Sequence, residues 1–466
     1  MRSLFHILML SAVILASLSA GERSNIRGLG MARTVNAASR GLHALGVNPA
    51  NLGMGGERAL SLDLFPFGFR MSSELISYDT YKDFFTGVPG PDGTRQPKFL
   101  TKEDKEKILN SFPQGIAVSQ LDFEMTLMGL GFYHPSVGGI GVSVVERIGT
   151  RVVVPKDYVA IFLYGLDSLG SRYVFDETNL SAWWWREYNL SYGMKLPVHL
   201  QDDIEFYAGI GLKYISGYGA LETTRYRATI ANERESGNQY RAKLFFDYLI
   251  KRSGVDILDP AREAAFSFFP EPAGSGFGVD LGFAARLRGL DVHVSITDIG
   301  SVTWKRNIVE TFGTYDLDLT DPFEGANEDT IQTAIRGKNR RGSEFSTNLP
   351  TKVRIGVALG ADTASRPSWM PSDLILTADM TQGFNESMGN SGDLRFSLGT
   401  EYRGIPGVPI RTGFSIGDDS RFRWAFGMAL DLRHFSFDFA TENLGLLFSL
   451  RNFDLYSFAM GFRFRF

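Results

Sequence analysis

The sequence contains no cysteine, which excludes disulfide bonds, thiolate metal sites and a lipid-modified N-terminal cysteine. It also lacks an excess of basic residues. The 48 lysines and arginines are set against 52 aspartates and glutamates, a formal net charge of −4, so the composition does not indicate nucleic acid as a partner. Beyond the N-terminus, no apolar run reaches the roughly 18 residues of a membrane-spanning helix. The sequence therefore predicts neither a nucleic-acid-binding protein nor a helical membrane protein.

Histidine is scarce as well. There are six, and no two lie close enough in sequence to form a pair of metal ligands on one helix or strand. His293 lies beside Ser295 and Thr297 on the polar face of a predicted strand, but no partner acid or nucleophile motif accompanies it. We therefore expect no enzyme activity, no metal and no cofactor, and His293 is interpreted most simply as a hydrogen-bonded luminal histidine.

The N-terminus has the three parts of a secretory signal. Arg2 supplies a positive end, Leu4 to Leu15 form a short apolar core, and the small residues Ala16 to Ala20 suit cleavage near Ala20. Residues 1–20 are therefore predicted to be a signal peptide, and the protein to be exported. The alternative is a buried N-terminal helix.

The chain contains 51 glycines and 37 phenylalanines, and many of its segments alternate between apolar residues and small or charged ones. At the C-terminus one face carries only apolar residues, and the other carries small or cationic ones: Tyr456, Phe458, Met460, Phe462, Phe464 and Phe466 against Ser457, Ala459, Gly461, Arg463 and Arg465. The same alternation recurs in 204–214, 277–286, 353–360, 394–403 and 421–432. A period of two residues predicts β-strands.

Three features favour lipid, rather than a protein core, on the apolar side of these strands. Their length of about ten residues matches a tilted spanning strand. Their polar faces mix small and charged residues, as a crowded lumen requires, and a closed barrel satisfies its own backbone in lipid. We therefore predict an all-β protein, a transmembrane antiparallel β-barrel. A soluble exported β-sandwich is the alternative.

The number of strands follows from counting such segments. We predict fourteen, with twelve or sixteen as alternatives: 58–71, 120–133, 139–148, 184–196, 204–217, 275–287, 291–304, 351–360, 373–380, 392–402, 410–417, 421–432, 435–440 and 456–466. An even count places both termini on the same side of the membrane, the periplasm.

The predicted connections alternate between short and long over the first eight strands. Segments 134–138, 197–203 and 288–290 are short, whereas 72–119, 149–183, 218–274 and 305–350 are long. This alternation is typical of barrels in the bacterial outer membrane, with long loops outside. Thr101 and Asp104 predict a capped helix over 102–110. Trp183 to Trp185 suit an interfacial aromatic girdle or an ordinary apolar cluster.

Residues 21–57 do not alternate and are rich in glycine, which predicts a plug that precedes a barrel over 58–466. The stretch Gly28 to Gly53, with Asn48-Pro49-Ala50, resembles the N-terminal hatch of the FadL-like long-chain fatty-acid transporters and of the related PorV barrels of type IX secretion. Asp298 to Trp304 resembles a stretch in an uncharacterised family of exported barrels. The resemblance implies a fourteen-stranded barrel with a luminal hatch.

Four residues of the predicted hatch are candidates for setting its gate through turn geometry: Gly46, Asn48, Pro49 and Gly53. The alternative is an ordinary turn without a gating role. A second set of candidates shares the predicted inward faces of strands eight to thirteen: Arg354, Arg395, Glu401, Arg403, Arg411, Arg421, Arg423 and Asp431, with Asp438 beside them. These charges either brace the lumen wall as a salt-bridge ladder or attract an anionic solute.

The function predicted first is a hatch-gated passive channel for small hydrophobic or amphipathic solutes. The alternatives are a structural or secretion-associated barrel whose long outer loops bind exported proteins, and a polar porin, which a plugged lumen disfavours. The terminal Phe466 resembles the signal that barrel-assembly machinery reads on outer-membrane precursors. The expected partners are therefore outer-membrane lipid, the assembly machinery, and a hydrophobic small molecule or an exported protein.

Overall fold

The computed structural model describes residues 24–466 except for 56–58, 76–77, 90–93, 167–169, 199–203, 235–239, 255–269, 288, 321–324, 362–365, 367, 386–389, 418–421 and 449–454. The predicted signal peptide, 1–20, lies outside the described residues.

Among the described residues, fourteen strands form a closed antiparallel ring. In ring order they are β1 (Leu60–Ser73), β4 (Ile116–His134), β5 (Gly138–Pro155), β7 (Asn179–Lys195), β8 (Glu205–Arg234), β10 (Gly274–Leu287), β11 (Leu290–Trp304), β15 (Lys352–Leu359), β16 (Leu374–Gly383), β17 (Arg395–Tyr402), β18 (Ile410–Ile416), β19 (Arg423–Asp431), β20 (Phe435–Thr441) and β21 (Leu455–Arg465). The last strand closes on the first, with Ser61 opposite Arg465 and Ser72 opposite Leu455. Fourteen strands are thus confirmed over twelve or sixteen, and closure removes the sheet edges.

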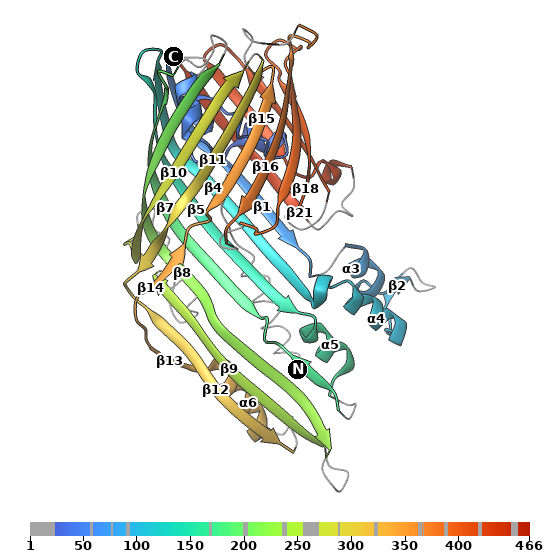
Figure 1. Ribbon diagram of the computed structural model, residues 1–466. Helices are drawn as coiled ribbons and strands as arrows, with labels where there is room; N and C mark the ends of the chain where they lie inside the picture. The colour runs from blue at the N-terminus through green and yellow to red at the C-terminus, as the bar shows by residue number, and fades with distance from the viewer. Residues whose placement is uncertain are drawn as a thin grey trace.

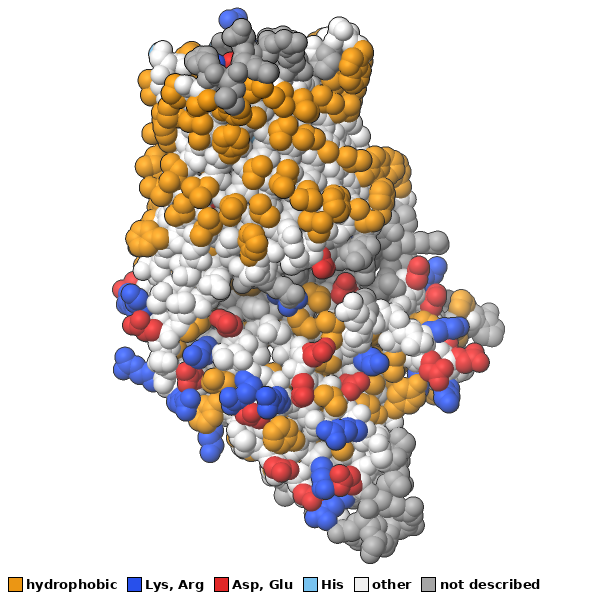
Figure 2. All heavy atoms as spheres, in the orientation of Figure 1, with side chains coloured by type: hydrophobic (Ala, Val, Ile, Leu, Met, Phe, Trp, Pro, Cys, Tyr) orange, Lys and Arg blue, Asp and Glu red, His pale blue; other side chains and the backbone are white. Residues whose placement is uncertain are grey.

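The alternation in the sequence separates the two faces of the wall. In β17, Phe396 and Leu398 are exposed, whereas Arg395, Ser397 and Glu401 are buried. On the face drawn in Figure 2, exposed apolar side chains of this kind form a belt over the half of the molecule that carries the short connections. Since such a belt is stable in hydrocarbon and not in water, the prediction of a membrane-spanning barrel is confirmed over a soluble sandwich. No helix among the described residues combines the length and the apolarity that a membrane crossing requires.

The two ends of the barrel differ. One end, called the turn end, carries the short connections and the C-terminus and lies at the top of Figure 1. The opposite loop end extends far beyond the apolar belt. There β8 continues to Arg234 and pairs with β9 (Tyr240–Gly254), which pairs with β12 (Val309–Leu319), which in turn pairs with β13 (Lys338–Arg341).

Further short elements lie at the loop end: α3 (Tyr78–Phe85), β2 (Val88–Pro89), β3 (Arg95–Gln96), α4 (Lys102–Asn110), α5 (Asp157–Tyr164), β6 (Arg172–Val174), α6 (Gly325–Arg336) and β14 (Phe345–Asn348). The predicted capped helix is confirmed as α4, where Thr101 and Asp104 form a capping box. The prediction that 218–274 and 305–350 are loops is wrong in part. Outside the belt the strands pack a small apolar core against α5 and α6, so the lipid-facing alternation no longer marks them.

The three consecutive tryptophans do not form a girdle. Trp183 and Trp185 are buried in a luminal cluster with Ile215, Val302 and Trp304 at the loop end, whereas Trp184 lies on the opposite face of β7. Neighbouring residues of a strand point to opposite faces, so three adjacent indoles cannot all face lipid. The interpretation as an apolar cluster is correct for two of the three.

Candidate functional site

The candidate site is the lumen, which the N-terminal segment, residues 24–55, occupies. It contains α2 (Ile26–Gly30) and two 3₁₀ helices, η1 (Gly41–Ala44) and η2 (Pro49–Met54). Helix α2 contacts β18 to β21, whereas η2 contacts β5, β7, β8 and β10. Because these strands lie on opposite sides of the ring, the segment crosses the lumen from wall to wall (Figure 1, blue).

Glycines on the inward face of the wall allow the backbone of η2 to touch the strands. A Cβ atom at Gly209 would lie 2.3 Å from the carbonyl carbon of Pro49, and one at Gly193 would lie 2.2 Å from the Pro49 carbonyl oxygen. A Cβ atom at Gly282 would lie 2.0 Å from Oδ1 of Asn48. Any larger residue would push the segment away, so these glycines position it.

The four predicted gate residues lie together on this contact surface or next to it. Asn48 is fully buried, and its side chain accepts a hydrogen bond from the backbone N–H of Ala50 (3.1 Å), which caps η2 ahead of Pro49. Gly46 adopts a φ of +69°, which favours glycine. A Cβ atom at Gly53 would lie 2.6 Å from the backbone nitrogen of Met194.

A buried network of asparagines that the sequence analysis missed joins the segment to β11 and its neighbours. Asn36 donates through Nδ2 to the carbonyl oxygens of His293 and Arg354, both at 3.1 Å, and its backbone N–H donates to Asp379 (2.8 Å). Asn51 donates to the Asn36 carbonyl oxygen (2.7 Å). His293 Nδ1 lies 2.7 Å from Oδ1 of Asn51, which agrees with its interpretation as a hydrogen-bonded luminal histidine.

The predicted luminal charges divide into groups. Glu401 accepts from Arg403 (2.6 Å) and Arg411 (2.7 Å), and also from Arg27 of the N-terminal segment (2.8 and 3.1 Å). Arg411 continues to Asp438 (2.5 Å). This chain of ion pairs joins β17, β18 and β20 of the wall to the N-terminal segment.

The other predicted charges form no described ion pair with this chain. Arg354 and Arg395 are buried, with Arg354 donating to Thr297 (2.9 Å), and Asp431 pairs with Arg465. Arg423 is partly buried at the start of β19, and Arg421 lies outside the described residues.

A second luminal cluster, on β4 to β11, was not predicted as a site. Arg147 contacts Glu187 (3.2 Å) and Glu124 (3.3 Å), and Lys213 contacts Asp280 (2.9 Å) and Asp298. Asp298 begins the stretch that resembles an uncharacterised family, and its φ of +59° marks an irregular point in β11. This cluster could have been expected from the sequence at one point, because Asp280 lies on the inward face of the predicted strand 277–286.

The wall is interrupted at one point of β1. Leu64 pairs with Phe462 of β21 and Phe67 pairs with Met460, so Phe65 and Pro66 together stand opposite Gly461. Neither residue pairs with β4. Phe65 is 54% exposed and has a φ of +54°, whereas Pro66 is buried and lines a cavity of about 50 Å³ beneath the N-terminal segment.

Comparison with known proteins gives a family and several similar structures. The model of a family of unknown function, DUF5723, matches residues 61–442. No curated protein matches the sequence. The fold is similar to that of the toluene transporter TbuX of Ralstonia pickettii, with a TM-score of 0.45 and 11% identity over 95% of this chain and 99% of that one.

Two further structures are similar to a comparable degree. One is a FadL homologue of Pseudomonas aeruginosa, with a TM-score of 0.43 and 11% identity over 97% of this chain and 100% of that one. The other is the toluene transporter TodX of P. putida, with a TM-score of 0.41 and 10% identity over 94% of this chain and 97% of that one. All three share only 10–11% of their residues with this chain, and the likeness is one of fold alone.

Proposed function

We propose that this chain, which belongs to the family of unknown function DUF5723, is an outer-membrane barrel with a passive route for small hydrophobic or amphipathic solutes. In this proposal residues 21–57 are a hatch that gates the lumen, and residues 58–466 are the barrel. The hinge side of the gate is the part where η2 contacts the wall, and it is formed by Gly46, Asn48, Pro49 and Gly53.

The observation that carries the proposal is how the N-terminal segment is held in the lumen. It is joined covalently to the barrel only through the entry to β1, and its other described links are hydrogen bonds, ion pairs and close packing. Interactions of this kind can break and re-form without unfolding the closed ring. A segment that blocks the lumen in this way fits a gate better than it fits a permanent core.

The interruption in β1 supports a sideways exit for solutes. Proline has no backbone N–H to donate to a neighbouring strand, so the wall is weakened at Pro66, next to a cavity. The exposed ring of Phe65 gives the outer rim of this point an apolar surface. The same cavity is lined by Glu124 and Arg147, which suits a solute with both polar and apolar parts.

The proposal also includes an orientation of the barrel in the membrane and a route of assembly. The turn end faces the periplasm, lipid of the outer membrane surrounds the belt, and residues 1–20 direct export. Phe466 is exposed and exchanges backbone hydrogen bonds with Leu60 at the seam (2.9 and 3.3 Å), a position that suits recognition by assembly machinery. His293 Nδ1 lies 2.7 Å from Oδ1 of Asn51, so this side chain is already hydrogen-bonded to the N-terminal segment.

The test is conductance and solute flux of the purified protein in planar bilayers and liposomes, intact and without residues 21–55. The intact protein should show almost no conductance or solute flux, and the truncated protein should admit amphipathic solutes. If neither form conducts although heat-modifiable gel migration shows a folded barrel, the channel proposal is overturned.

One observation favours a second candidate function. The loop end carries a folded unit with its own apolar core, and charged pairs such as Arg225–Asp247 and Lys243–Glu233 cover its exposed face. A rigid surface of this kind suits the binding of an exported protein. Under this second function, removing residues 21–55 should leave partner binding unchanged and should open no solute route.

A further inference from the structure

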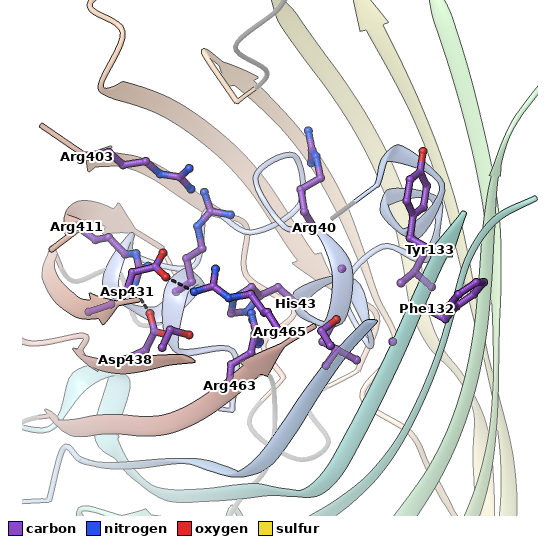
Figure 3. A pocket seen from close by; sticks show the side chains of 18 of the residues that line it. Arg40, His43, Phe132, Tyr133, Arg403, Arg411, Asp431, Asp438, Arg463 and Arg465 are labelled. Atoms are coloured by element: carbon purple, nitrogen blue, oxygen red, sulfur yellow. Dashed lines mark hydrogen bonds and ion pairs between the residues drawn. The ribbon is translucent and has the colours of Figure 1, made fainter. Parts of the chain in front are cut away.

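A second cavity opens at the turn end, beneath the N-terminal segment, and its volume is about 90 Å³ (Figure 3). Its apolar lining includes Leu42 and Leu52 of the segment. Six guanidinium groups line it: Arg27, Arg40, Arg403, Arg411, Arg463 and Arg465. Among the described residues, the carboxylates that line it are Asp431 and Asp438. Arginine is therefore the dominant side chain of this cavity.

The carboxylates near the cavity do not balance these arginines. Glu401 alone accepts hydrogen bonds from three guanidiniums, those of Arg27, Arg403 and Arg411. The other partner carboxylates each pair with one of the six: Asp438 with Arg411, Asp63 with Arg463, Asp291 with Arg40, and Asp431 with Arg465. Among the described residues, these six guanidinium groups therefore meet five partner carboxylates.

Several guanidinium N–H groups are available to a ligand. Arg403 donates to Glu401 through Nε, and the structure describes no hydrogen-bond partner for either of its terminal nitrogens. Its side chain is 46% exposed, so a ligand can reach these nitrogens. For Arg411 the described hydrogen bonds leave Nη2 without a partner, and for Arg463 they leave Nη1. Guanidinium groups bind carboxylate and phosphate oxygens through such parallel N–H donors.

Burial and neighbouring arginines lower the pKa of two bases of the N-terminal segment. Burial, followed by the charges of Arg463 and Arg27, holds the pKa of His43 well below its usual range. His43 is therefore neutral, and its Nδ1 accepts from Arg463 (3.4 Å). Burial lowers the pKa of Arg40 to about 10, even though Asp291 acts in the opposite direction.

We propose that this cavity binds an oxyanion, a carboxylate or phosphate group of a small solute, through Arg403, Arg411 and Arg463. The site lies at the mouth of the lumen that the proposed orientation places in the periplasm. The site goes beyond the channel function, because an anion can bind there whether or not any solute crosses the barrel.

The test is isothermal titration calorimetry on the full-length barrel in a non-ionic detergent, at constant ionic strength. Sodium phosphate and sodium acetate serve as separate probes, so that the preferred oxyanion is identified. At least one should bind at millimolar concentrations or below. Arg403→Gln should weaken that binding about ten-fold or more, since it removes a charged donor pair. Arg340→Gln, at a half-exposed arginine of the loop end that pairs with Glu310, should leave it unchanged.

A second variant acts in the opposite direction. Asp431→Asn removes a carboxylate from the cavity lining, so anion binding should tighten several-fold if the net charge of the cavity determines it. This variant also decides the matter if Arg403→Gln fails to fold. The proposal is overturned if neither probe binds the wild-type protein, or if Arg403→Gln binds as tightly as Arg340→Gln. It is equally overturned if Asp431→Asn leaves the affinity unchanged.

Discussion

Arg27 and Glu401, which are 374 positions apart in the sequence, form a two-point ion pair inside the barrel. Glu401 is fully buried on β17, and Arg27 belongs to α2 of the N-terminal segment. The pair is part of a chain that continues through Arg411 to Asp438, so the mobile side of the proposed gate and the fixed wall share one set of charges. The first prediction of the gate proposal depends on this link.

Glu401→Gln should loosen the N-terminal segment. The substitution leaves three guanidiniums facing a neutral amide, and loss of one partner of a buried ion pair typically costs about 3 kcal/mol. Hydrogen exchange of residues 24–54 should accelerate, and conductance events should become more frequent. Glu233→Gln, which breaks the exposed pair with Lys243, is the matched control and should change neither quantity. Equal exchange in the two variants would contradict the role of Glu401 as a latch.

A larger residue at Gly209 should displace η2. A Cβ atom there would lie 2.3 Å from the Pro49 carbonyl carbon and 2.4 Å from the Ala50 nitrogen, and both neighbours are backbone atoms that cannot rotate away. Gly209→Val should therefore raise solute flux through liposomes while the barrel stays folded on gels. Gly392→Ala, where a Cβ atom meets nothing within 4 Å, should behave like the wild type. Wild-type flux in Gly209→Val would show that η2 does not close the lumen.

The absence of cysteine allows the segment to be locked by a single engineered disulfide. A Cβ atom at Gly141 would lie 3.4 Å from Cγ of Leu45, which suits a cross-link between Leu45→Cys and Gly141→Cys. In the Glu401→Gln background, where solute flux is expected, the oxidised double cysteine variant should show no flux, and reductant should restore it. Each single variant should be insensitive to reductant. A gate that must move is excluded if the oxidised and reduced forms conduct equally.

The sideways exit depends on the unpaired stretch in β1. Pro66→Val restores a backbone N–H and favours a regular strand, so it should reduce the passage of hydrophobic solutes from the lumen into the bilayer several-fold. Fluorescent hydrophobic probes in liposomes measure this passage. Conductance of small ions in the variant lacking residues 21–55 should not change when Pro66→Val is added. A fall in both would indicate a damaged barrel rather than a closed exit.

Helix α4 should respond to pH through its cap. The backbone N–H of Thr101 donates to Asp104 (3.0 Å), and this bond holds the pKa of the Asp104 carboxyl below its usual range. The pKa of Asp104 is thus lower in the folded helix than in the unfolded chain. The hydrogen bond therefore contributes fully to helix stability above the unfolded pKa of about 3.9, and this contribution is lost as the pH falls through the folded pKa. Hydrogen exchange of 102–110, corrected for intrinsic rates, should show less protection near pH 3 than at pH 6.

Thr101→Ala should mimic acid at the same helix. Loss of an N-cap side chain costs about 1 kcal/mol of helix stability. The loss should be confined to 102–110, since α4 lies at the loop end, away from the N-terminal segment. Protection equal to that of the wild type at pH 6 would show that the capping box does not stabilise α4.

The sequence by itself determined the wall of this protein. A strand in lipid must alternate, so the inward and outward faces of segments such as 394–403 and 456–466 could be assigned from their residues alone, and the strand count followed. The glycine-rich, non-alternating stretch before the first strand was equally visible. These features are local, because each depends on what one residue and its next neighbours meet.

Only the tertiary structure decided which residues meet inside the wall. The pairing of Arg27 with Glu401 depends on ring closure and on how α2 crosses the lumen, and no local pattern carries that information. The Asn36 network and the Lys213 cluster were missed for the same reason. The break at Pro66 was hidden because its effect depends on the register of two partner strands. Contacts across a lumen are set by closure of the whole chain, whereas the alternation of a strand is set residue by residue.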